Sequence, residues 1–149
     1  MRPEVPVVDC AAVATSVLDA YNRRDWTAIE AACAPTISFH DRALNLGGDG
    51  REKYLEYWQQ FSAAITNQII SDVTVESSEV FTAVTTLTCS GDHDGADFLP
   101  GFPAKHAHVQ ARLCALWRCD EQGLLVRNEW FWDLLTVLRC LGQVDLAVR

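Results

Sequence analysis

Several side chains that can transfer protons lie at the ends of short apolar segments. His40 and Asp41 close the β-branched segment TISFHD at residues 36–41. Imidazole is a base near neutral pH, and an aspartate in an apolar cavity has a raised pKa that suits acid–base catalysis. Because adjacent strand residues point to opposite faces, only one of the two can enter a given cavity. Each is therefore a candidate catalytic group, with a surface position as the alternative.

A histidine pair opens the most apolar region of the chain, residues 106–142. His106 and His108 alternate with apolar residues, and His108 shares its strand face with Arg112. Either this polar face lines a cavity, with His108 as an acid–base group and Arg112 in the wall, or the opposite apolar face lines it. The pair lacks a third ligand, so we expect no metal site.

Two carboxylates belong to the tryptophan-rich region: one lies within the segment at residues 124–132 and the other follows it directly. Glu129 lies between aromatic residues, which would raise its pKa and suit it to acid–base catalysis unless it points to solvent. Asp133 is either a catalytic group or the N-cap of a final helix. Trp130 lies on the opposite strand face from Glu129, and we expect it to shape the cavity.

Aromatic residues recur at helical spacing in two further segments. Tyr21 lies on the apolar stripe of a helix that Asp9 can cap, and its phenol could bind a substrate carbonyl or enolate oxygen. Tyr54 and Trp58 lie on the stripe of a helix at residues 51–65, for which Asp49 is the expected cap. We expect these two residues in the cavity wall.

The periodicity predicts an α+β plan. Helices are expected from residue 9, over residues 25–34 and 51–65, and over a short C-terminal segment that ends at Gly142. Strands are expected at residues 36–41, 67–77, 79–91, 104–119 and 124–132, with a glycine-rich loop at 45–50. A bent sheet wrapped on helices leaves a conical cavity. The loop before the fourth strand carries Phe98, Leu99 and Phe102 and is a candidate lid.

Composition limits the partners. The 149 residues suit one domain over 1–149, and the net charge of −8 without a basic cluster argues against nucleic-acid binding. No apolar run is long enough to span a membrane, and the N-terminal stretch lacks the apolar centre of a signal peptide, so we expect a cytoplasmic protein. The six cysteines form no C-x-x-C pair, and we expect buried free thiols.

Three segments resemble the SnoaL-like polyketide cyclases of the NTF2-like superfold: AYNRRDWTAIEAACAPTISFHD, GGDGREKYLEYWQQF and EWFWDLLTVLRCLG. The last resembles the terminal W-x-x-D of the family, with Asp133 as its aspartate. The resemblance implies a cone in which a strongly curved mixed or antiparallel sheet wraps around three N-terminal helices, followed by a short C-terminal helix. Trp130 aligns with the acid–base aspartate of aklanonate-type cyclases, and Glu129 is its neighbour.

A local likeness to scytalone dehydratase covers DAYNRRDWTAIEAACAPTISFHDR and KHAH. It aligns Tyr21 with a catalytic tyrosine and Asp41 with the position of a second one. Gln68 takes the place of a catalytic histidine. This departure argues against scytalone dehydration itself, while a shared cavity plan remains.

Together these features predict a cofactor-independent enzyme that performs cyclisation, isomerisation or dehydration on a small hydrophobic substrate, polyketide- or terpenoid-like. Epoxide hydrolysis or epoxide-opening cyclisation in the same cavity is one alternative. A non-catalytic ligand-binding or dimerisation module is the other. We expect a homodimer, because the outer face of an open sheet usually needs cover.

Overall fold

The computed structural model describes residues 3–4 and 7–145. The two ends of the predicted 1–149 domain therefore lie partly outside the described residues. The same holds for the N-terminal stretch, which was predicted to lack a signal peptide. The helices are α1 (Cys10–Asn22), α2 (Trp26–Ala32), α3 (Arg51–Ala64) and α4 (Leu134–Cys140). The strands are β1 (Cys33–Asp41), β2 (Leu46–Asp49), β3 (Ile69–Ser78), β4 (Thr82–Asp92), β5 (His108–Cys119) and β6 (Leu125–Trp132).

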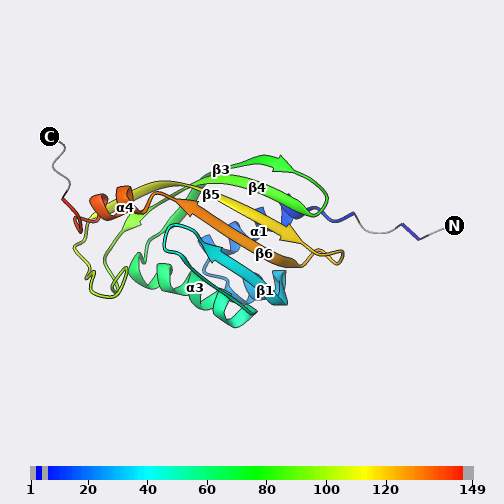
Figure 1. The fold of residues 1–149 in the computed structure, drawn as a ribbon, viewed down its shortest axis with the longest axis horizontal. Coiled ribbons are helices and arrows are strands. Elements are labelled where there is room, and N and C mark those ends of the chain that lie inside the picture. The colour runs from blue at the N-terminus through cyan, green and yellow to red at the C-terminus, as the bar shows by residue number, and fades with distance from the viewer. Residues whose placement is uncertain (1–2, 5–6, 146–149) are drawn as a thin grey trace.

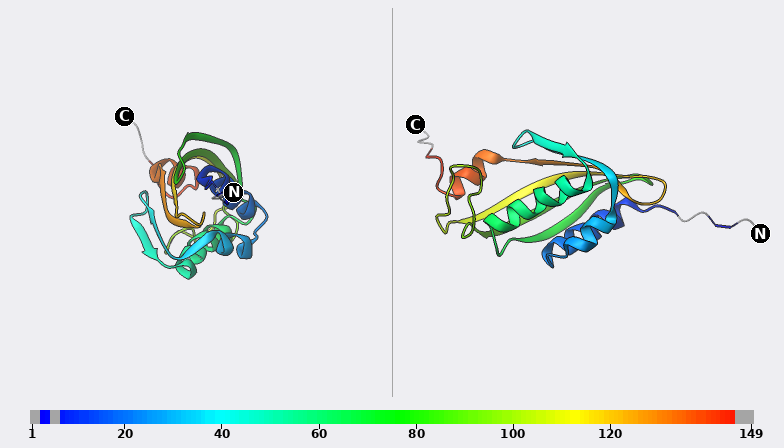
Figure 2. Two further views of the ribbon diagram at one scale, coloured as in Figure 1. Left: turned by 90° about the vertical axis from the view of Figure 1, so that its right-hand side faces the viewer. Right: turned by 90° about the horizontal axis from the view of Figure 1, so that it is seen from below.

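The strands form one six-stranded sheet in the order β2-β1-β6-β5-β4-β3 (Figure 1). Only β1 and β6 run parallel, and the other neighbours are antiparallel. The sheet curves around α1 and α3, which contact β3–β5 and β1–β2 respectively (Figure 2). The predicted α+β cone with a mixed sheet is confirmed.

Aspartate side chains start three of the helices. Asp9, Asp25 and Asp133 accept hydrogen bonds from the backbone N–H groups of Ala12, Ala28 and Thr136. All three caps confirm the predicted helix starts, the second of them at Asp25 before the helix expected over residues 25–34. Gly142, in the left-handed conformation at φ 69°, follows the last helix as predicted.

The glycine-rich segment at residues 45–50 differs from the prediction. Leu46–Asp49 is a strand, β2, that pairs with the end of β1 instead of forming a loop. Gly47 lies so close to Phe39 that a Cβ atom would stand 2.3 Å from the Phe39 carbonyl oxygen, so only glycine permits this pairing. Gly50 rather than Asp49 is the N-cap of α3, and no side chain caps that helix.

The core fills the space between the concave face of the sheet and the helices. Inward residues of α1, α3, β1, β4, β5 and β6 form one apolar cluster, and a smaller cluster joins the C-terminal end of α3 to α4 and the loop before β5. In the described part of the chain, no helix has the length and apolar character that crossing a bilayer requires.

Candidate active site

An apolar cavity of about 70 Å³ opens between α3, the inner face of the sheet and α4. Its wall consists of Tyr21, Tyr57, Trp58, Phe61, Ile65, Gln68, Ile70, Cys89, Phe98, Val109, Ala111, Leu113, Trp130, Trp132 and Val137. Val109, Ala111 and Leu113 alternate along β5, so the apolar face of that strand lines the cavity. This settles the alternative that the sequence left open.

Asp41 lies immediately behind this wall. It is the last residue of β1, follows the inward residues Ile37 and Phe39, and is fully buried. Its Oδ2 accepts hydrogen bonds from Tyr57 Oη at 2.8 Å and Trp132 Nε1 at 3.0 Å. Its Oδ1 accepts from the backbone N–H groups of residues 43 and 44, each at 3.0 Å. Four donors and no acceptor surround the group, the pattern that suits a carboxylate.

Tyr57 connects this carboxylate to the cavity. Burial raises the pKa of its phenol well above the ordinary value, and the neighbouring Asp41 raises it further. The hydroxyl therefore stays protonated and donates a hydrogen bond to Asp41. The sequence interpretation omitted Tyr57, although it lies three residues after Tyr54 and four before Phe61, a spacing that places it on the same stripe.

Tyr21 is a second phenol in the wall. Its hydroxyl donates to Gln68 Oε1, and burial raises its pKa well above the ordinary value. Arg24 lies over the Tyr21 ring, 4.6 Å from its centroid, and bonds to the carbonyl oxygens of Tyr21 and Gln68. Tyr21 and Gln68, each predicted separately as a site residue, therefore meet at the cavity.

Tyr54 supports the wall from behind. Its hydroxyl and Trp130 Nε1 both donate to Asn128 Oδ1, at 2.7 and 2.6 Å. Tyr54 does not line the cavity itself, whereas Trp58 and Trp130 do, with their ring centroids 5.4 Å apart. Of these three predicted wall residues, the structure places Trp58 and Trp130 in the wall and Tyr54 behind it.

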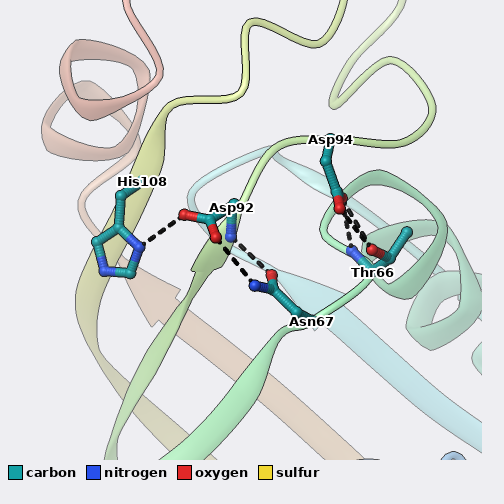
Figure 3. Close-up of polar contacts among 5 residues, drawn as sticks. All are labelled: Thr66, Asn67, Asp92, Asp94 and His108. Carbon is teal, nitrogen blue, oxygen red and sulfur yellow. Dashed lines mark hydrogen bonds and ion pairs between the residues drawn. The ribbon is translucent and has the colours of Figure 1, made fainter.

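The loop between β4 and β5 closes one side of the cavity. Phe98 is buried and packs against Phe61 and Trp132. Leu99 and Phe102, the other two expected lid residues, do not line the cavity. The loop is tied down where it starts: Asp94 accepts from Thr66, and Asp92 bonds to Asn67 (Figure 3).

The sequence comparisons agree with this architecture. A family model described as the SnoaL-like domain matches residues 14–128. The chain belongs to the SnoaL-like domain family. No curated protein sequence matches the chain significantly.

Solved structures show the same fold as this SnoaL-like domain. Two are each described as a "putative polyketide cyclase". The one from Pseudomonas putida KT2440 has a TM-score of 0.76 at 16% identity and covers 87% of this chain and 95% of its own. The one from Xanthomonas campestris pv. campestris has a TM-score of 0.75 at 18% identity, with coverage of 91% and 96%. A hypothetical protein with a ketosteroid isomerase-like fold from Catenulispora acidiphila DSM 44928 has a TM-score of 0.71 at 16% identity, with coverage of 87% and 92%.

Four of the predicted site residues lie on the outer face of the sheet of the SnoaL-like domain. His108 is exposed and pairs with Asp92 at 2.9 Å (Figure 3). Arg112 bonds to Thr88 Oγ1 at 3.2 Å on the same face. His40 and Glu129 line a separate polar groove of about 330 Å³ between β2 and β6. The expected wall position of Arg112 is therefore corrected, and none of these four side chains reaches the apolar cavity.

Glu129 is held by two arginines instead of by aromatic rings. Its Oε1 accepts from Arg127 Nη2 at 2.7 Å and Arg42 Nη2 at 2.5 Å, and its side chain is 9% exposed. Arg127 first and Arg42 second hold the pKa of Glu129 below its usual range, the opposite of the expected direction. Asp133 is likewise outside the cavity: as the cap of α4 it bonds to Thr136, which lowers its pKa.

The Glu129 cluster gives the stability of the domain a pH dependence. Because the pKa of Glu129 is depressed in the folded state, the stabilisation by its two ion pairs is fully present above the unfolded-state pKa. It is lost as the pH falls through the folded-state pKa. Glu129→Gln should cost about 1 kcal/mol at pH 7, since both arginines are half exposed and screened. Urea denaturation should show that the difference in unfolding free energy between the wild type and Glu129→Gln shrinks between about pH 5 and pH 3. An equal difference at both ends would contradict the ion-pair origin.

A thiol also lines the cavity. Burial raises the pKa of Cys89 to about 12, so it is protonated at neutral pH and unsuited to nucleophilic attack. Among residues 3–4 and 7–145, no three His, Cys, Asp or Glu side chains gather to hold a metal ion. Of the six cysteines predicted to be buried, Cys140 is exposed, which corrects that expectation.

Proposed function

We propose that this SnoaL-like domain is an enzyme that moves a proton on a small apolar substrate with a carbonyl group, leading to cyclisation, isomerisation or dehydration. One observation carries the proposal: a buried carboxylate, Asp41, stands one hydrogen bond behind a phenol in the wall of an apolar cavity. The descriptions of the related structures as polyketide cyclases and as ketosteroid isomerase-like support the same reaction class.

The proton would pass through Tyr57. Its oxygen takes a proton from the carbon beside the substrate carbonyl while its own proton moves to Asp41 Oδ2. Because the Tyr57 pKa is raised, a phenolate does not accumulate, and the two transfers are concerted. The reverse steps return the proton to a different substrate atom. Tyr21 would donate to the enolate oxygen in place of Gln68.

The size of the cavity requires the lid to move. A volume of about 70 Å³ is well below the roughly 300 Å³ at which ligand pockets begin. Phe98 occupies the space between Phe61 and Trp132, and its displacement would extend the cavity towards α4. Binding is therefore expected to couple to opening of the loop between β4 and β5.

Solvent-deuterium exchange into β-tetralone, an apolar bicyclic ketone, tests the proposal. The protein should accelerate exchange at the carbon between the carbonyl and the ring, with saturation in ketone, as followed by proton NMR. Exchange at the rate of buffer alone, with the ketone bound in the cavity, would instead identify a ligand carrier.

We also propose that the domain is a homodimer through its outer sheet face. Leu116 on β5 and Phe131 on β6 are exposed apolar side chains on this face, where β5 and β6 pair side by side. Covering them with a second copy would remove that apolar surface from water. Sedimentation velocity at micromolar concentration should give a dimer for the wild type and a monomer for Leu116→Asp. Val80→Asp, at an exposed apolar residue in the turn between β3 and β4, serves as the control and should remain dimeric. A wild-type monomer would contradict the proposal.

A further inference from the structure

Two cysteines from opposite ends of the chain meet in the core. Cys10 is the first residue of α1 and Cys119 the last of β5, 109 positions apart, and their sulfur atoms lie 3.0 Å from one another. Both are buried, at 0% and 3% exposure. Cys33 is equally buried but donates to the Ile29 carbonyl oxygen, which makes it a natural control.

We propose that Cys10 and Cys119 form an oxidation site, at which a peroxide converts the two thiols into an internal disulfide. The sulfurs need to approach by only about 1 Å to reach the bonding distance of roughly 2.05 Å. The bond would join the start of α1 to the end of β5. Since α1 also carries Tyr21, the cross-link would fix the helix that supplies one side of the cavity.

The surroundings assign the two sulfurs different roles. Cys119 donates to the sulfur of Cys10, which lowers the pKa of Cys10 and raises that of Cys119. The N-terminus of α1 also favours a thiolate at Cys10. The Asp9 carboxylate opposes a thiolate at both sulfurs, and the Asp120 carboxylate adds to this at Cys119. Cys10 is therefore the attacking thiolate, and Cys119 is the resolving thiol.

The reaction balances with hydrogen peroxide as the oxidant. The Cys10 thiolate attacks one peroxide oxygen, breaks the O–O bond and becomes a sulfenic acid, and the released hydroxide takes up a proton as water. The Cys119 sulfur then attacks the Cys10 sulfur, and the sulfenic oxygen leaves as a second water. In sum, two thiols and one peroxide give one disulfide and two waters.

The test treats the reduced full chain with stoichiometric hydrogen peroxide, then blocks free thiols under denaturing conditions and maps peptides without reduction. We expect a linked peptide that joins Cys10 to Cys119 in the wild type and in Cys33→Ala. Closing so long a loop should raise the Tm by more than about 5 °C, reversibly with dithiothreitol. Cys119→Ala should show neither change.

Three results would overturn the proposal: recovery of both cysteines as alkylated thiols while exposed Cys140 is oxidised, oxidation of either one to a sulfinic acid, or linkage of either one to another cysteine. The same Tm rise in Cys119→Ala would also do so. The wild-type peptide map decides the question even if a variant fails to fold.

Discussion

Asparagine in place of Asp41 should lower kcat for deuterium exchange into β-tetralone by about 100- to 10,000-fold, the range that a positioned acid–base group contributes. Asparagine has nearly the same shape, and its amide oxygen can accept from the two donors on one side of the group. Its NH2 group cannot accept from the other two, and it cannot take up a proton. KM should change little, because Asp41 is fully buried behind the wall and is not among the residues that line the cavity. Proton NMR gives both constants.

Glu129→Gln is the matched control for that variant. Glu129 is a similarly buried carboxylate one strand away from Asp41, and it faces the outer groove. It should retain exchange within about twofold, and circular dichroism should show both variants folded. A loss below about fivefold for Asp41→Asn, or an equal loss for the two variants, would show that Asp41 is not the proton acceptor.

Alanine in place of Trp117 should destabilise the domain by about 3–5 kcal/mol. Trp117 is fully buried on the inner face of β5, packs on Trp130 with ring centroids 5.6 Å apart, and donates to Thr85 Oγ1 at 2.9 Å. Its loss leaves a cavity and an unpaired hydroxyl at the same place. Urea denaturation at pH 7 measures the cost.

Phe81→Ala is the control for the loss of an aromatic ring. Phe81 precedes β4 and is 41% exposed, so its removal should cost less than about 1 kcal/mol. If Trp117→Ala were equally mild, the apolar face of β5 would not point inward, and the wall of the cavity would have to be assigned again.

Sequence periodicity and capping chemistry were sufficient for most of the fold. Asp9 and Asp133 start helices because a side-chain oxygen three residues before a free N–H is a purely local device. β2 was missed because its glycine-rich composition is typical of a loop. The segment becomes a strand only through the close approach of Gly47 to Phe39, a contact with another part of the chain.

The candidate site was less predictable, because alternation identifies two faces of a strand without saying which one is inside. His108 and Arg112 on β5 were as compatible with a wall as Val109 and Leu113 were. Which face of β5 points inward depends on the side chains that α3 and the loop before β5 place opposite that strand. Likewise, the pKa of Glu129 was predicted from its aromatic neighbours along the strand. Its side chain instead contacts Arg127, two residues earlier on the same strand face, and Arg42, which the fold brings over from the end of β1.

Asp41 was among the candidates, but its role could not be assigned from the chain. Its two side-chain donors, Tyr57 and Trp132, lie 16 and 91 positions away, and only the fold brings them to one oxygen atom. The same holds for the Cys10–Cys119 pair, which no spacing rule connects.

A crystal structure with β-naphthol, a planar mimic of the enol of β-tetralone, tests the central claim most directly. We expect the ring to pack against Trp58 and Trp130, the carbon that would carry the transferred proton to lie within about 3.5 Å of Tyr57 Oη, and the Tyr57–Asp41 hydrogen bond to remain intact. Phe98 should have moved from its position against Phe61. A ligand in the outer groove beside His40, or one in the cavity with Tyr57 turned away from Asp41, would contradict the account.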